Sequence, residues 1–190
     1  MAIKNRNVFC IEGEWDPDDL RNQSSVKPIL ETLSKVRKRD FSYIHRRVAK
    51  TDELSFYLAK WTQKKYESYG VLALAMHGTK SKLQLAGLRN EISLDQLAGI
   101  IDGQGKDRII YLGSCDTLGI GQEEIKEFKR KTKAMAIIGY EKTVDWIESA
   151  AFEMLLFDLL TWYKTMSVVE SRLKSDYQSL SEKLGLVFIK

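Results

Sequence analysis

The sequence predicts an α/β protein, a three-layer sandwich in which helices cover both faces of a mostly parallel sheet. Three observations support this class. Short apolar runs alternate along the chain with segments in which apolar residues recur at helical spacing. The apolar runs are continuous, which is typical of strands buried on both faces. Strands separated by helices are joined by crossover connections, and such connections produce parallel sheets.

The first half of the chain contains three of the expected strands and two helices. The strands are the runs 7–13, 41–49 and 70–76, and the second is half polar, so we expect it near a sheet edge. Ser24 and Ser25 are suited to cap a helix, and Pro28 then falls in its first turn, where proline is tolerated. Each helix has an apolar face, formed by Ile29, Leu33 and Val36 in the first and by Leu54, Tyr57, Leu58 and Trp61 in the second.

The second half repeats the alternation after a short polar hairpin expected within 80–92. Ser93-Leu94-Asp95-Gln96 is a capping-box pattern that opens a helix ending at Gly103. The remaining elements are expected in chain order as strand 107–113, helix 122–132, strand 134–140, an almost wholly apolar helix 144–163, one amphipathic helix carrying Val169 to Leu184, and a terminal strand in 185–190.

Length and composition favour a single soluble domain spanning 1–190. The net charge of +4 comes from scattered basic runs, which are typical of solvated helix ends, so we expect no nucleic-acid partner. Glu153 and Asp158 interrupt the longest apolar stretch, so no membrane span is expected. No signal peptide is apparent, and two cysteines do not form a disulfide framework, which predicts a cytoplasmic location. Neither a metal cluster nor a cofactor motif is apparent.

Polar residues follow two of the expected strands at the point where each strand ends. His77 directly follows 70–76, and Ser114-Cys115 follow 107–113. If these strands are neighbours, both side chains reach the sheet edge at which parallel sheets bind ligands. A thiolate can attack a carbonyl carbon, and an imidazole can protonate the leaving amine. The main-chain N–H groups of Gly78 and Cys115 are suited to bind the resulting oxyanion.

Each of these residues also has a simpler interpretation. A cysteine after an apolar strand is usually a small core residue, and a histidine at a strand end is usually a hydrogen-bonded surface residue. The joint occurrence at two strand ends favours the catalytic interpretation. Cys10 lies within its apolar run and is expected in the core, whereas His45 adjoins two arginines and is expected at the surface.

Two blocks of the sequence resemble a known family. "LALAMHG" (72–78), followed by "IIYLGSC" (109–115), resembles the His-Gly and Ser-Cys blocks of the caspase-like cysteine peptidases. "AMAIIGYEKTVDWIESAAFEMLL" (134–156) is similar to the corresponding block of the CHAT and separase members. The resemblance covers roughly 70–160, although Gly113-Ser114 stands where caspases have Gln-Ala. The short length and the opening "FCIEGEWD" (9–16) resemble a bacterial subgroup of stand-alone caspase-like proteins.

The resemblance implies a role for each matching position. Cys115 would be the nucleophile, His77 the general acid, and Gly78 part of the oxyanion hole. Asp145 matches the acidic position that holds a basic side chain just before the cleaved bond in CHAT-like and separase-like members. A second interpretation of Asp145 is that it only caps the helix that follows. Asp116 departs from the expected chemistry, because a carboxylate beside the nucleophile opposes thiolate formation unless it is turned away or paired.

The sequence thus supports two classes of function. One is a caspase-like cysteine endopeptidase that acts on protein or peptide substrates. The other is a non-catalytic interaction module of flavodoxin-like or caspase-like fold, because a fold does not guarantee an activity. Nothing in the sequence indicates the oligomeric state. A nucleotide-binding protein is not expected, since the glycines and lysine of a P-loop are missing.

Overall fold

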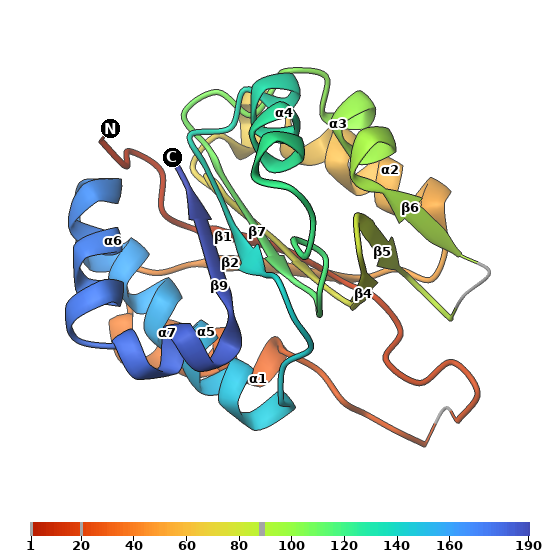
Figure 1. Ribbon diagram of the computed structural model, residues 1–190, viewed down its shortest axis with the longest axis horizontal. Coiled ribbons are helices and arrows are strands. Elements are labelled where there is room, and N and C mark those ends of the chain that lie inside the picture. The colour runs from red at the N-terminus through yellow and green to blue at the C-terminus, as the bar shows by residue number, and fades with distance from the viewer. Residues whose placement is uncertain (1, 20, 88–89) are drawn as a thin grey trace.

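The central element of the protein is a six-stranded sheet with the order β2-β1-β3-β7-β8-β9 (Figure 1). The structure is a computed structural model that describes residues 2–19, 21–87 and 90–190. The parallel strands are β1 (Val8–Glu12), β2 (Tyr43–Arg47), β3 (Val71–Ala75), β7 (Ile109–Gly113) and β8 (Ala136–Tyr140). β9 (Leu186–Ile189) adds an antiparallel edge beside β8. The predicted succession of the strands of the central sheet along the chain is therefore confirmed.

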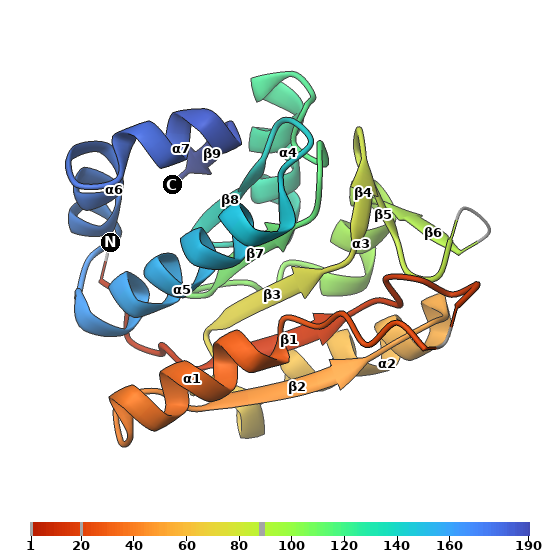
Figure 2. The same cartoon turned by 90° about the horizontal axis from the view of Figure 1, so that it is seen from below.

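Helices cover both faces of this sheet, as Figures 1 and 2 show from two directions. One face carries α2 (Thr51–Trp61), α3 (Leu94–Ile101) and α4 (Gln122–Thr132). The other carries α1 (Lys27–Arg37), α5 (Trp146–Trp162), α6 (Met166–Ser175) and α7 (Gln178–Leu184). A short 3₁₀ helix, η1 (Lys64–Tyr66), follows α2. The three-layer sandwich predicted from the alternation of elements is confirmed.

Alternate side chains of each strand enter two separate cores. In β3, Ala73 and Ala75 pack on the α5 side of the sheet, whereas Leu72 and Leu74 pack on the α3 side. All five residues of β1 and of β3 are buried, which explains the continuous apolar runs.

The capping box predicted at Ser93 is present. The Ser93 hydroxyl accepts a hydrogen bond from Gln96 N at 3.2 Å, and Gln96 Oε1 accepts one from Ser93 N at 2.9 Å. The two bonds satisfy main-chain donors that the first turn of α3 would otherwise leave unpaired.

Two expected elements differ from the structure. The polar hairpin is instead a three-stranded antiparallel sheet of β4 (His77–Thr79), β5 (Lys82–Gln84) and β6 (Glu91–Ser93), so His77 belongs to a strand. The single last helix is two helices, α6 and α7. Tyr177, which lies between them, has a main-chain conformation outside the helical region, with φ −128° and ψ 25°.

His45 is not the surface residue that its arginine neighbours suggest. Its side chain is only 10% exposed, and its Nε2 lies 2.6 Å from Glu12 Oε2. The cause is the strand register. His45 pairs with Cys10 across the sheet, and Glu12 lies two residues further along the same face of β1. The imidazole of His45 is therefore buried because it pairs with the buried carboxylate of Glu12.

In the parts of the chain that the structure describes, no helix combines the length and the apolar character that crossing a membrane requires.

Candidate active site

Three strand ends meet at one edge of the sheet. β3 pairs in parallel with β7, and Ala75 lies opposite Gly113 at their carboxyl ends. His77 and Cys115 each follow two residues later. β1 lies on the other side of β3, and the chain beyond it reaches the same edge. The strand order reverses around β1, which is flanked by β2 and β3. Such a switch point is where open α/β sheets bind ligands.

Gly78 allows β4 to approach the turn that carries Cys115. A side-chain Cβ built on Gly78 would lie 2.6 Å from the carbonyl oxygen of Cys115 and would also collide with Ser114 and Thr117. Only glycine fits this contact without displacing the main chain. The pairing of β3 with β7 brings the His-Gly block and the cysteine turn together, and the missing side chain of Gly78 allows them to touch.

His77 and Cys115 line the same cavity of about 240 Å³. Trp15 and Trp146 form part of its wall, and their rings pack edge to face with their centroids 4.6 Å apart. Glu153 adds a carboxyl group to an otherwise mostly apolar lining. A cavity of this kind suits a long side chain with an apolar stem and a polar end.

The imidazole of His77 is oriented by a main-chain carbonyl. Its Nε2 lies 2.8 Å from the carbonyl oxygen of Trp15, and the indole of Trp15 packs edge to face on the imidazole with centroids 5.1 Å apart. A carbonyl oxygen can only accept a hydrogen bond, so Nε2 carries the proton. Nδ1 is then the nitrogen available to exchange a proton with another group.

The two cysteines have different environments. Cys115 is partly exposed, and its Sγ lies 3.9 Å from the carbonyl oxygen of Val144. Cys10 is buried in the core, as predicted. Burial and the nearby carboxylates of Glu12 and Glu153 raise the pKa of the Cys10 thiol well above its ordinary value. Cys115 is therefore the thiol that a substrate can reach.

Asp116 has a left-handed main-chain conformation with φ 52°, and its carboxylate lies against Gly119. A side chain at Gly119 would collide with that carboxylate. This position directs the charge toward the turn that follows the cysteine, which agrees with the condition under which an acidic neighbour is tolerated.

Glu153 is a site residue that sequence reasoning did not identify. It lies on α5, and its Oε1 accepts a hydrogen bond of 2.9 Å from the hydroxyl of Tyr111, which is 2.7 Å from the hydroxyl of Tyr140. Burial raises the pKa of Glu153 to about 7; the Tyr111 bond opposes this rise and the charge of Glu12 adds to it. One available signal was its spacing, because Glu153 precedes Leu156 and Leu160 by three and seven residues on the inward face of the helix.

Asp145 caps α5. Its Oδ1 accepts hydrogen bonds from Ile147 N at 2.9 Å and from Glu148 N at 3.0 Å. Of its two interpretations, the helix cap is thus observed directly. The cavity that His77 and Cys115 share is lined by the next residue, Trp146, and by Glu153 from further along the helix.

The amino-acid sequence matches one protein family over most of its length. Residues 5–188 match the model of a family of unknown function, DUF6642. The chain belongs to this family. None of the curated proteins compared with it matches.

Solved structures share the fold of this DUF6642 chain. Caspase-1 from Spodoptera frugiperda superposes with a TM-score of 0.58 at 15% identity, covering 100% of this chain and 88% of that one. A secreted C11 cysteine protease from Bacteroides thetaiotaomicron, solved with an irreversible peptide inhibitor, superposes with a TM-score of 0.57 at 9% identity. That match covers 95% of this chain and 60% of the protease. The fold is therefore caspase-like.

Proposed function

We propose that the protein is a cysteine endopeptidase that uses His77 and Cys115 as a dyad. The observation that carries the proposal is the shared cavity, in which a partly exposed thiol accompanies an imidazole whose Nε2 is held by a main-chain carbonyl. The caspase-like fold is consistent with it. The resemblance of 134–156 to the CHAT and separase block further suggests that side of the superfamily.

The proposed reaction proceeds through an acyl-enzyme. His77 Nδ1 takes the proton of Cys115 Sγ, and the sulfur attacks the carbonyl carbon of the scissile peptide bond. The main-chain N–H groups of Gly78 and Cys115 bind the oxygen that becomes negative. His77 then gives its proton to the amide nitrogen, and the C–N bond breaks. Water attacks the thioester, releases the carboxylic acid and restores the thiol.

We also propose that the enzyme prefers a basic residue before the cleaved bond. The carboxyl group that lines the cavity belongs to Glu153, and a cationic side chain there would form a charge-assisted pair with it. Asp145 is the second candidate, because its Oδ2 does not take part in the helix cap. A peptide library with arginine, lysine, aspartate or leucine before the bond tests the proposal. Cleavage after arginine or lysine is expected, and no cleavage of any peptide favours the non-catalytic interaction module.

Replacing Glu153 with glutamine is expected to lower kcat/KM for basic peptides by roughly 10- to 100-fold, because the ion pair is lost while the side-chain volume is kept. Peptides with a leucine at the same position should change little. In the parent, kcat/KM for basic peptides should rise as the pH increases through about 7, since the Glu153 carboxyl ionises there. The ratio of kcat/KM for basic peptides to kcat/KM for leucine peptides should show this rise in the parent and lose it in the variant, because other groups that titrate affect both peptides alike.

Asp145→Asn is the matched control for this experiment. Asparagine is as good a helix cap as aspartate, so the variant removes a charge and keeps the first turn of α5. If the basic preference persists in Glu153→Gln and disappears in Asp145→Asn, then Asp145 is the specificity residue and the assignment of Glu153 is wrong.

A further inference from the structure

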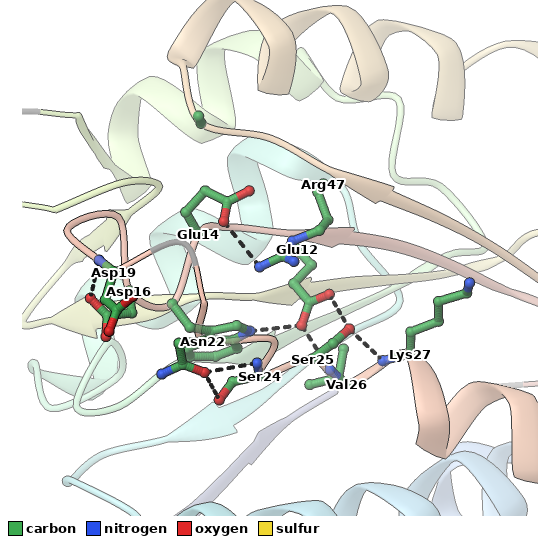
Figure 3. Close-up of polar contacts among 12 residues, drawn as sticks. Glu12, Glu14, Asp16, Asp19, Asn22, Ser24, Ser25, Val26, Lys27 and Arg47 are labelled. Carbon is green, nitrogen blue, oxygen red and sulfur yellow. Dashed lines mark hydrogen bonds and ion pairs between the residues drawn. The ribbon is translucent and has the colours of Figure 1, made fainter.

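Glu12 is a fully buried carboxylate at the carboxyl end of β1. Its Oε1 accepts hydrogen bonds of 2.7 Å from the indole Nε1 of Trp15 and from Val26 N. Its Oε2 accepts one of 2.7 Å from the Ser25 hydroxyl and lies 2.6 Å from His45 Nε2. Figure 3 shows this carboxylate between the loop that follows β1 and the start of α1. Four donors therefore converge on one side chain.

The convergence keeps Glu12 charged. Burial by itself would raise the pKa of Glu12, but the hydrogen bonds from His45, Trp15, Ser25 and Val26 outweigh it and leave that pKa below its ordinary value. A carboxylate has enough lone pairs to accept all four bonds. A neutral amide of the same shape has one acceptor oxygen and would turn N–H donors toward two of these partners.

These contacts fasten both ends of the loop that joins β1 to α1. Trp15 lies near the start of the loop, and Ser25 and Val26 lie at its end, so a single carboxylate ties together chain segments ten residues apart. The main chain just before Trp15 is held separately, because Gly13 N and Glu14 N donate to the carbonyl oxygens of Ala75 and Leu85.

Trp15 connects the anchor, which is the Glu12 carboxylate with its four hydrogen-bond donors, to the candidate active site. Its indole N–H binds Glu12, its ring packs on the His77 imidazole, and its carbonyl oxygen accepts the hydrogen bond from His77 Nε2. The direction of that carbonyl depends on how residue 15 is held. The indole bond to Glu12 and the ring contacts with His77 and Trp146 hold its side chain.

From this arrangement we propose that Glu12 is a positioning residue for His77, acting through the indole and the main-chain carbonyl of Trp15. The inference rests on the proposed role of His77 in peptide cleavage. With the anchor in place, Nε2 keeps its proton and Nδ1 remains free to accept the one from Cys115. Without it, the carbonyl loses its fixed direction, and the imidazole also populates the tautomer that is protonated on Nδ1, which cannot take that proton.

Two variants test the proposal from the two ends of the anchor. Glu12→Gln removes the charge and keeps the side-chain length. Trp15→Phe removes the indole donor and makes the side chain smaller, but leaves an aromatic ring to pack on His77. Glu14→Gln is the matched control, because Glu14 lies on the same segment and its carboxylate pairs with Arg47 at 3.0 Å (Figure 3). Thermal unfolding of each protein establishes which variants are folded.

The measurements are steady-state kinetics and the ¹⁵N chemical shifts of the His77 ring. We expect both variants to lower kcat by on the order of 10- to 100-fold with a smaller change in KM, since the loss is one of geometry at the reacting groups. The His77 shifts should move from those of a single Nε2-protonated tautomer to those of a mixture. Glu14→Gln should match the parent in both respects.

Each outcome decides the question. Folded variants with the parental tautomer overturn the proposal, whether or not kcat falls, because a rate loss would then arise elsewhere. If Glu12→Gln does not fold, the result for Trp15→Phe stands in its place. If the parent protein cleaves no peptide, the ring shifts still report on positioning. A mixture of tautomers in the variants would then support the role of Glu12 while the peptidase assignment fails.

Discussion

Cys115→Ala is expected to abolish peptide cleavage while the protein stays folded. In the proposed mechanism the sulfur of Cys115 forms the acyl-enzyme, and none of the described residues that line the cavity offers a second thiol to replace it. Cys115 is partly exposed at the end of β7, so losing its sulfur removes little buried contact. Initial rates on the best peptide of the library measure cleavage, and a thermal unfolding curve shows whether the variant is folded. Parental turnover by the variant would contradict the assignment.

Cys10→Ala provides the matched control for the loss of a thiol. Cys10 is buried in the core at the middle of β1, and its replacement leaves a small void that costs about 1 kcal/mol of stability. Its thiol cannot reach a substrate, so the rate of cleavage should match that of the parent protein. An equal loss of activity in the two variants would indicate a shared structural effect and not the loss of a nucleophile.

His77→Ala is expected to slow cleavage by on the order of 10²- to 10⁴-fold, which is the usual contribution of a positioned acid or base. Acylation should slow most. The variant lacks the imidazole, held by the carbonyl of Trp15 in the parent, that takes the thiol proton and returns it to the leaving amine. Single-turnover kinetics with enzyme in excess isolates that step. Imidazole added to the buffer should restore part of the rate, since the truncated side chain leaves space in the cavity.

Unchanged acylation in His77→Ala would contradict the dyad. A loss of unfolding temperature equal to that of a core variant would also weaken the interpretation, because the effect would then be structural. His77 lies in the short strand β4 and is exposed, so a large loss of stability is not expected.

The fold could be predicted from the sequence because its determinants are local. Continuous apolar runs, helical spacing and the Ser93 capping box each depend on neighbouring residues alone. The proximity of the His77 and Cys115 blocks also followed from chain order, since short crossovers tend to place successive parallel strands side by side. The pairing of β3 with β7 confirms that expectation.

The parts that sequence reasoning missed depend on contacts between distant segments. Glu153 looks like an interruption of an apolar helix until α5 is placed over β7, where Tyr111 meets it. His45 looks like a surface residue until the register of β1 and β2 brings it to Glu12. The group that holds His77 is a main-chain carbonyl, which every residue type has, so its sequence position gives no signal.

The proposed dyad depends most on the cavity in which the sulfur of Cys115 meets the imidazole of His77. Its most direct test is the rate at which a chloromethyl ketone of a basic peptide labels each cysteine, followed by mass spectrometry of the intact protein and of its His77→Ala variant. The account predicts rapid labelling of Cys115, little labelling of Cys10, and a large fall in the Cys115 rate when His77 is replaced. Labelling of Cys115 that is slow, no faster than that of Cys10, or independent of His77 would contradict it.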